Sequence, residues 1–213
     1  MVSLAAKAYQ ELSNKIIYGE FLPGDVLSEN VLSSELNMSR TPIREALSRL
    51  TTEGFVITLK NRGILVKDIS YKELFDIQGL NYALQAHAAD LAADGVITFD
   101  ESILTDHFNK QLKATKENNY IEYVNQSILF GRSMIQSVNN QTMLDTFDSL
   151  RNKTIRMAVV NWKLTPNKRH YSANEVNKKV LDAISNKEYS QIRLILREQL
   201  SSSRDRFVKN GEI

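Results

Sequence analysis

The chain has 213 residues, of which 42% are apolar and 24% are charged, and this balance excludes an intrinsically disordered polypeptide. It contains no cysteine, which excludes disulfides, thiolate metal sites and cysteine catalysis, and its net charge of +2 is too small to indicate a nucleic-acid binder by charge alone. No apolar run reaches the roughly 18–20 residues of a membrane span, and residues 1–7 lack a secretory signal, so we expect a cytoplasmic protein with no membrane partner.

The first predicted helix covers residues 4–17, where apolar side chains recur every four positions at Leu4, Ala8, Leu12 and Ile16. Residues 21–25 contain Pro-Gly-Asp, which is typical of a turn. A second, short helix is predicted to open at Ser28, whose hydroxyl can accept hydrogen bonds from the free amides of the first turn. This second helix is predicted to end at a tight break at Asn37-Met38.

The third predicted helix begins at Ser39, a favourable N-cap residue, and ends at Gly54. Pro42 is tolerated in its first turn, because the amides there have no partner within the helix. One face is apolar, with Ile43, Ala46, Leu47 and Leu50 at helical spacing. Polar and basic residues lie off that stripe, so this helix is expected to bury one side and expose the other.

Two short β-prone segments follow, at residues 55–59 and 63–66, joined by Lys60-Asn61-Arg62-Gly63. This pattern predicts a hairpin with a basic tip. Three helices followed by a small hairpin constitute a winged helix-turn-helix, which we assign to residues 1–69.

From Tyr71 onward the pattern is helical almost throughout, and short breaks predict antiparallel packing in a bundle. Residues 70–213 are therefore expected to form an all-helical second domain, and the fold class is mainly α. The predicted helices lie near residues 71–94, 99–117, 120–138, 140–163, 173–185 and 188–209.

The helix that begins at Ser39 is the candidate for reading DNA, because the N-terminal residues of such a helix reach base edges in the major groove. Arg40 and Arg44 are one turn apart, and each guanidinium can grip a guanine edge or a phosphate. The alternative is that both are merely solvated, with Arg44 near Glu45 and Glu53. For Arg49, a contact with the DNA backbone and a surface ion pair are both open. The candidate DNA-binding residues are Ser39, Arg40, Thr41, Arg44, Arg49, Arg62 and Gly63.

Residues 21–29, 36–47 and 50–55 resemble the GntR family of bacterial transcription regulators, through a signature of the form PG…LSE…L…SRTP.REAL..L..EG. The helical part, with Leu74–Ile77 and Leu181–Ile184, resembles the FCD ligand-binding bundle of the FadR subfamily. The resemblance implies a homodimer on a palindromic double-stranded DNA operator, usually as a repressor, controlled by a small-molecule effector in the bundle. Where the subfamily often carries an arginine after Ser-Glu, this chain has Asn30, which alters a potential DNA contact.

Many FCD bundles hold a divalent metal with one aspartate and three histidines. The resemblance places these four ligands at Ser127, Gly131, Asn177 and Gln199, none of which is a good metal donor. We therefore expect neither a metal nor another cofactor. The three histidines, His87, His107 and His170, are expected to have structural roles.

A cavity can nevertheless remain in the bundle. Ser127, Asn177 and Gln199 are then polar groups facing an effector, and Gly131 leaves extra room, while Gln78 and Tyr82 on the first bundle helix also line the space. The alternative is a filled core in which the amides satisfy one another. If the effector is an acid, Arg132, Arg151 and Arg156 are candidates to hold its carboxylate, with surface ion pairing as the alternative.

Enzymatic activity is not expected, since the sequence has no cysteine, no glycine-rich phosphate loop and no close grouping of histidine, acid and serine. The remaining alternative to a ligand-controlled regulator is a helical interaction or dimerisation module with a filled core and no effector.

Overall fold

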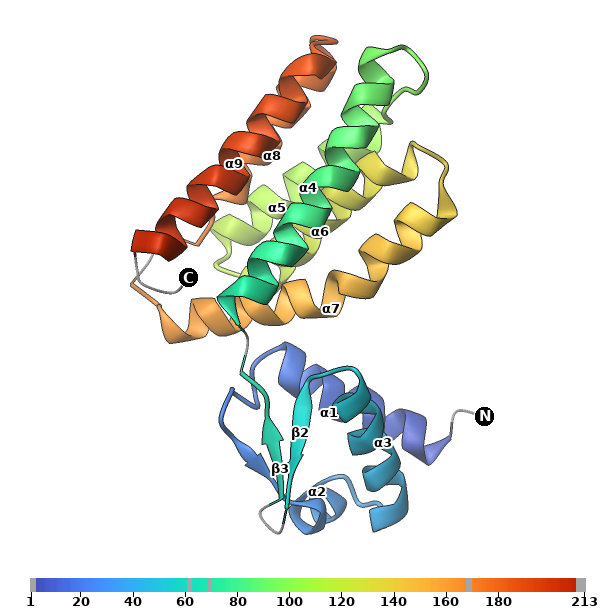
Figure 1. Ribbon diagram of the computed structural model, residues 1–213, viewed down its shortest axis with the longest axis vertical. Helices are drawn as coiled ribbons and strands as arrows, with labels where there is room; N and C mark the ends of the chain where they lie inside the picture. The colour runs from blue at the N-terminus through green and yellow to red at the C-terminus, as the bar shows by residue number, and fades with distance from the viewer. Residues whose placement is uncertain (1–2, 61–62, 69, 168–169, 210–213) are drawn as a thin grey trace. The chain divides into compact units, whose positions relative to one another are not determined.

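The computed structural model describes residues 3–60, 63–68, 70–167 and 170–209, with side chains up to residue 205. Its contacts divide the chain into two compact units, Met1–Ile69 with Val159–Leu164, and Ser70–Ala158 with Thr165–Ile213. Figure 1 shows the first unit as a small mixed α/β body and the second as a group of long helices.

The helices of the first unit are α1 (Leu4–Ile17), α2 (Glu29–Glu35) and α3 (Arg40–Thr52). They form where the sequence predicts them, and α3 packs against both α1 and α2. Their apolar stripes meet in one core, because Leu12, Ile43 and Leu50 are all fully buried. Burying one face of α3 in this way fixes the direction of its opposite, polar face.

A small antiparallel sheet completes this unit, with β1 (Val26–Leu27), β2 (Val56–Leu59) and β3 (Gly63–Val66) in the order β1-β3-β2. Val56 lies opposite Val66, which sets the register of the predicted hairpin, and Val26 lies opposite Leu65. The sequence did not predict β1, because two residues carry no readable alternation of polar and apolar positions. The arrangement is a winged helix-turn-helix.

The caps of α2 and α3 differ from the sequence-based expectation. Ser28 and Ser39 occupy the N-cap positions with extended backbone, but neither side chain makes a capping hydrogen bond. The break between α2 and α3 is made instead by the backbone, since Asn37 adopts a left-handed φ of 50°. Asparagine is among the residues that tolerate this conformation best.

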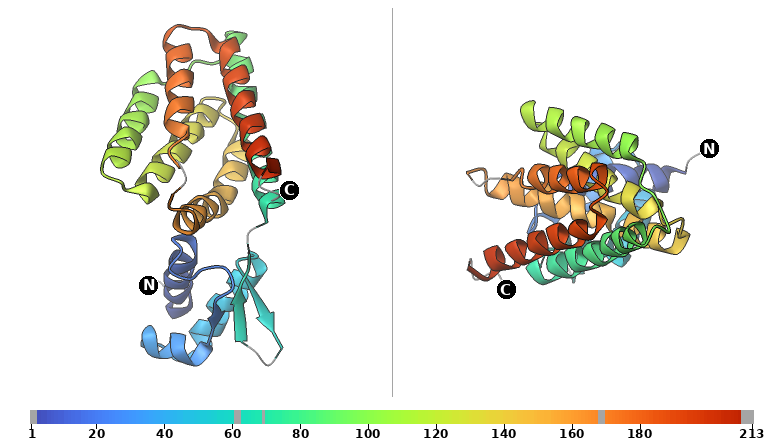
Figure 2. Two further views of the ribbon diagram at one scale, coloured as in Figure 1. Left: turned by 90° about the vertical axis from the view of Figure 1, so that its left-hand side faces the viewer. Right: turned by 90° about the horizontal axis from the view of Figure 1, so that it is seen from above.

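The second unit consists of helices at almost the predicted positions, and α4 lies beside α9 (Figures 1 and 2). A buried cluster that includes Phe108, Phe130, Met134 and Ile192 forms its main core. The helices are α4 (Tyr71–Ala93), α5 (Glu101–Lys116), α6 (Tyr120–Gln136), α7 (Gln141–Leu164, of which Val159–Leu164 belong to the first unit), α8 (Ala173–Ser185) and α9 (Tyr189–Lys209).

Gly63 at the start of β3 offers a test of the wing geometry. It has a φ of +93°, and a Cβ at this position would lie 3.0 Å from the Leu27 carbonyl oxygen. Gly63→Ala is expected to lower the free energy of unfolding by more than the ~1–2 kcal/mol that a left-handed backbone costs alone. Gly24→Ala is the matched control, because Gly24 has a φ of +92° with nothing within 4 Å of its Cβ position.

Chemical unfolding of the two alanine variants, followed by circular dichroism, separates the cost of a positive φ from the cost of the Cβ contact with Leu27. A larger loss for Gly63→Ala than for Gly24→Ala is the expected result. Equal losses would mean that the Cβ added at residue 63 is accommodated without a costly contact with the Leu27 carbonyl oxygen.

Candidate functional site

The N-terminal half of α3 presents a polar and basic surface. Ser39, Arg40, Thr41 and Arg44 are all exposed, while Ile43 on the opposite side of the helix is fully buried. Because Arg40 and Arg44 are one helical turn apart, they project from the same face of α3. The structure therefore brings these four predicted residues together on one exposed end of the helix.

Arg44 is engaged by an acidic residue from the neighbouring helix. Its Nε lies 2.7 Å from Glu29 Oε2 at the start of α2, whereas the sequence-based alternative placed it near Glu45 and Glu53. The contact uses only Nε, so the terminal Nη1 and Nη2 groups lie outside it. The arginine side chain stays 64% exposed, so Glu29 orients Arg44 without burying it.

Arg40 borders a shallow groove where α2, β1 and the wing meet. The groove is lined by Arg40, by Gly63 at the start of β3, and by residues 26–30, which include Asn30. Asn30, at the position where the subfamily often carries an arginine, therefore lines the same groove as Arg40. Arg62, predicted at the wing tip, lies outside the described residues.

Arg49 is held at the other end of α3. Its Nε lies 2.9 Å from Glu53 Oε1, and its guanidinium carbon lies 3.7 Å from the centre of the Tyr9 ring on α1. The Tyr9 hydroxyl donates to Glu53 Oε2 at 2.7 Å. Burial, followed by this hydrogen bond, raises the pKa of Tyr9, and the hydrogen bond to Glu53 raises the pKa of Arg49. These contacts hold α1 against the C-terminal end of α3. Of the two roles left open for Arg49 by the sequence, the structure contains the ion pair.

The helical unit contains a cavity of about 230 Å³. Residues from α4, α6, α7, α8 and α9 contribute to its wall, and all six residues proposed from the sequence as effector contacts are among them. Those six are Gln78, Tyr82, Ser127, Gly131, Asn177 and Gln199. The sequence did not point to Asn81 or Gln85, which also line the cavity from α4.

The polar groups around the cavity are amides and hydroxyls. Asn177 is buried, and its Nδ2 donates to Gln111 Oε1 at 2.8 Å and more weakly to Ser127 Oγ at 3.4 Å. Gln78 Oε1 and Asn81 Oδ1 are buried and accept no hydrogen bond within the described part of the chain. The described lining contains no aspartate, glutamate, lysine, arginine or histidine.

Gly131 allows Gln85 to approach the backbone of α6. A Cβ at residue 131 would lie 3.1 Å from Gln85 Oε1 and 3.2 Å from Gln85 Cδ. The amide of Gln85 therefore takes the space that a larger side chain on α6 would need. No sequence pattern signalled this contact, because Gln85 is an ordinary polar residue on a helix surface until the bundle is assembled.

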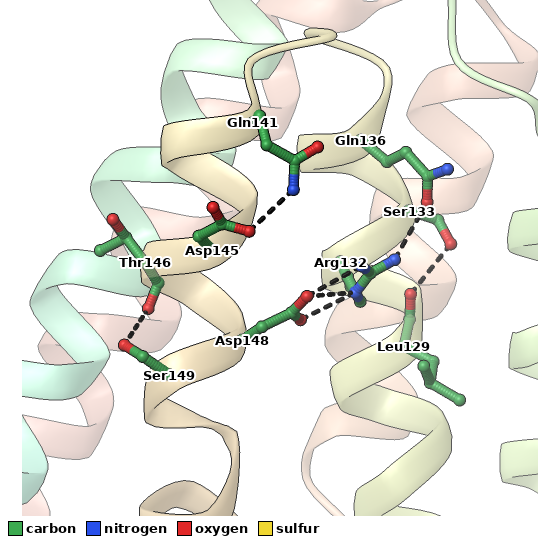
Figure 3. A network of polar contacts seen from close by, with 9 residues as sticks. All are labelled: Leu129, Arg132, Ser133, Gln136, Gln141, Asp145, Thr146, Asp148 and Ser149. Atoms are coloured by element: carbon green, nitrogen blue, oxygen red, sulfur yellow. Dashed lines mark hydrogen bonds and ion pairs between the residues drawn. The ribbon is translucent and has the colours of Figure 1, made fainter.

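The arginines proposed as carboxylate ligands do not line the cavity. Arg132 on α6 makes a bidentate pair with Asp148 on α7, with contacts of 2.8 Å from both Nε and Nη2, and Nη1 reaches Gln136 (Figure 3). Arg151 donates to Asn125 Oδ1 at 2.8 Å. Arg156 is buried elsewhere along α7. Arg132 and Arg151 thus connect α7 to α6. For Arg132 this is the ion pair that the sequence left open as the alternative to binding a carboxylate.

The histidines also lie away from the cavity wall. His107 Nδ1 is 2.8 Å from Gln126 Oε1, and His170 Nε2 is 2.7 Å from the Thr165 carbonyl oxygen, while His87 is exposed. Among the described residues, no group of three or more histidine or acidic side chains is placed to hold a metal ion. No helix in the described ranges is long and apolar enough to cross a membrane.

Comparison with known protein families identifies both domains of the chain. Residues 4–66 match the profile of the bacterial regulatory proteins of the gntR family, and residues 76–202 match that of the FCD domain. The chain belongs to the GntR family. Its combination of a GntR helix-turn-helix domain with an FCD domain is the FadR-type architecture, and proteins of this family are transcriptional regulators, not enzymes.

Curated relatives of this GntR-family chain carry regulator names. It is 38% identical over 91 residues to the Nta operon transcriptional regulator of Aminobacter aminovorans, covering 43% of each chain. It is 29% identical over 143 residues to the gluconate operon transcriptional repressor of Bacillus licheniformis, covering 66% of this chain and 58% of the relative. The chain thus spans about half the length of these relatives.

Solved structures support the fold of the GntR-family chain. A transcriptional regulator GntR from Rhodococcus sp. RHA1 superposes with a TM-score of 0.78 at 18% identity, covering 96% of this chain and 97% of the other. McbR/YncC of E. coli gives a TM-score of 0.71 at 21% identity, covering 99% and 100%.

Proposed function

We propose that this protein is a homodimeric DNA-binding regulator that represses transcription from a palindromic operator and responds to a small metabolite in its FCD cavity. The observation that carries the DNA-binding part is the exposed N-terminal face of α3, where Arg40 and Arg44 project together. A helix presented in this way fits the major groove, and a two-fold dimer would match a two-fold operator.

Within this proposal, Arg44 and Arg40 read base edges or grip phosphates through their guanidinium groups. Ser39 and Thr41 hold a phosphate together with the free amides at the start of α3. Gly63 and Arg62 place the wing against the DNA backbone or minor groove. Arg49 acts by fixing α3 on α1, because Glu53 and Tyr9 already engage its guanidinium.

The effector part of the proposal rests on the cavity in the helical unit. Its volume of about 230 Å³ and the unpartnered oxygens of Gln78 and Asn81 favour a ligand site over the alternative of a filled core. Control of DNA binding requires that the effector bind one arrangement of the two DNA-binding domains better than another.

Gel-shift and footprinting with the full chain on promoter DNA from its own gene neighbourhood test the proposal. We expect a specific complex, with two chains bound to a site of two-fold symmetry. Binding that is equally strong to random DNA of the same length would overturn the proposed function.

A further inference from the structure

We infer that the FCD cavity is a metal-independent site for an uncharged metabolite that carries several hydroxyl or carboxamide groups. This inference rests on the proposed effector function and specifies its ligand. Three independent features of the cavity lead to it: its metal-ligand positions, its charge and its unpartnered acceptors.

The four positions that resemble the metal ligands of the FCD family do not fit a divalent metal. Ser127, Asn177 and Gln199 offer only a hydroxyl and neutral amides, which bind transition metals poorly, and Gly131 offers no donor. A Cβ at residue 131 would lie 3.1 Å from Gln85 Oε1, so the neutral amide of Gln85 occupies space that a side chain at the family's ligand position would need. Asn177 Nδ2 is already hydrogen-bonded to Gln111.

The lack of a charged residue in the described lining of the cavity disfavours a bare carboxylate as its ligand. Burying an anion is costly unless a cation or several donors meet it, and the described lining has no cation. Arg132, the nearest candidate by sequence to Gly131, is paired with Asp148 through Nε and Nη2 (Figure 3). An uncharged ligand avoids this desolvation cost.

The unpartnered acceptors indicate what the ligand must supply. Gln78 and Asn81 are about one helical turn apart on α4. Their oxygens Oε1 and Oδ1 are buried and accept no hydrogen bond from the described residues. Hydroxyl and amide groups donate hydrogen bonds without carrying charge, and they also accept from amide N–H groups. Phe147, Leu196 and Leu200 are among the other lining residues, so the ligand meets an apolar surface as well.

The size of the cavity restricts the ligand to a small molecule. At about 230 Å³ it is below the ~300–1,000 Å³ of sites for drug-sized ligands. A polyol, a sugar or a hydroxy-amide of metabolite size fits all three requirements.

The experiment uses the full chain after dialysis against EDTA and a panel of matched pairs, in which each neutral molecule has its carboxylate counterpart. Gluconamide with gluconate and lactamide with lactate are two such pairs, and glucose and glucitol extend the neutral half. Thermal shift identifies binders, and titration of the protein–operator complex measures their effect. We expect neutral members to raise the melting temperature without added metal, and Zn²⁺ or Ni²⁺ alone to leave it unchanged.

Two variants assign a binder to the cavity. Gln78→Leu removes one unpartnered acceptor and is expected to weaken binding of the neutral probe by about tenfold. Gln141→Leu is the control, because Gln141 is exposed at the start of α7, donates to Asp145 (Figure 3) and does not line the cavity. Equal affinity in wild type and Gln78→Leu would overturn the assignment.

The outcomes separate this inference from the proposed function. A carboxylate that binds more tightly than its neutral partner, or a Zn²⁺-dependent gain in affinity, overturns the inference but preserves effector control if the operator complex responds. If neither half of the panel binds, both the inference and effector control fail, whereas operator binding remains a separate measurement.

Discussion

Arg44→Ala is expected to weaken binding of the full chain to its operator by about 5- to 150-fold, the equivalent of ~1–3 kcal/mol for one lost bidentate base contact. The loss should fall on specific binding, because the side chain of Arg44 is 64% exposed at the N-terminal end of α3 and its Nη groups lie outside the pair with Glu29. Fluorescence anisotropy on operator and scrambled duplexes, at one salt concentration, measures the ratio of the two affinities.

Three companion variants make the result specific. Arg193→Ala removes an exposed arginine of α9 that pairs with Asp90, so it lowers the charge equally and should leave the specificity ratio unchanged. Arg44→Lys keeps the positive charge but loses the planar guanidinium. Compared with Arg44→Ala, it should restore binding to random DNA more than it restores the specificity ratio. If Arg40→Ala acts through a phosphate instead of a base, it will weaken both duplexes alike and reduce the salt dependence. A specificity ratio that Arg44→Ala leaves intact would contradict the assignment of α3 as the reading helix.

Ile43→Ala is expected to destabilise the protein by about 2–5 kcal/mol, because Ile43 is fully buried on the inner face of α3 and alanine leaves a cavity there. The same substitution should also weaken operator binding increasingly as the temperature rises. The packing of the buried face of α3 sets the orientation of its exposed face, which carries Arg40 and Arg44. Urea unfolding and operator binding at two temperatures measure both effects.

Ile57→Ala is the matched control for Ile43→Ala. Ile57 lies on β2 and is 39% exposed, so its truncation should cost much less. Similar losses for the two variants would show that burial in the α3 core does not govern the stability of this unit.

The helices could be predicted from the sequence because their signals are local. A stripe such as that of α1, a break at Gly54 and the apolar spacing of α3 each depend on neighbouring residues, and the structure has these elements within a few residues of the predicted ends. The six cavity residues were reached by a different route, the resemblance of Ser127, Gly131, Asn177 and Gln199 to a known ligand pattern, together with the expected face of α4.

The features that could not be predicted depend on contacts between distant segments. Strand β1 exists only because β3 pairs with it, and a dipeptide such as Val26-Leu27 has no periodicity of its own. The partner of Arg44 is Glu29, 15 positions away, whereas local spacing suggested Glu45 or Glu53. The close packing of Gln85 on Gly131 likewise joins two helices whose mutual register no single-sequence pattern specifies.

The approach of Gln85 to Gly131 makes the energetic effects of substitutions at these two positions interdependent. A Cβ added at residue 131 would lie 3.1–3.3 Å from the Gln85 amide, so the end of the Gln85 side chain has to shift before any side chain fits there. Substitutions at residues 85 and 131 are therefore expected to be non-additive in their effect on stability, because shortening Gln85 changes the cost of adding a side chain at 131.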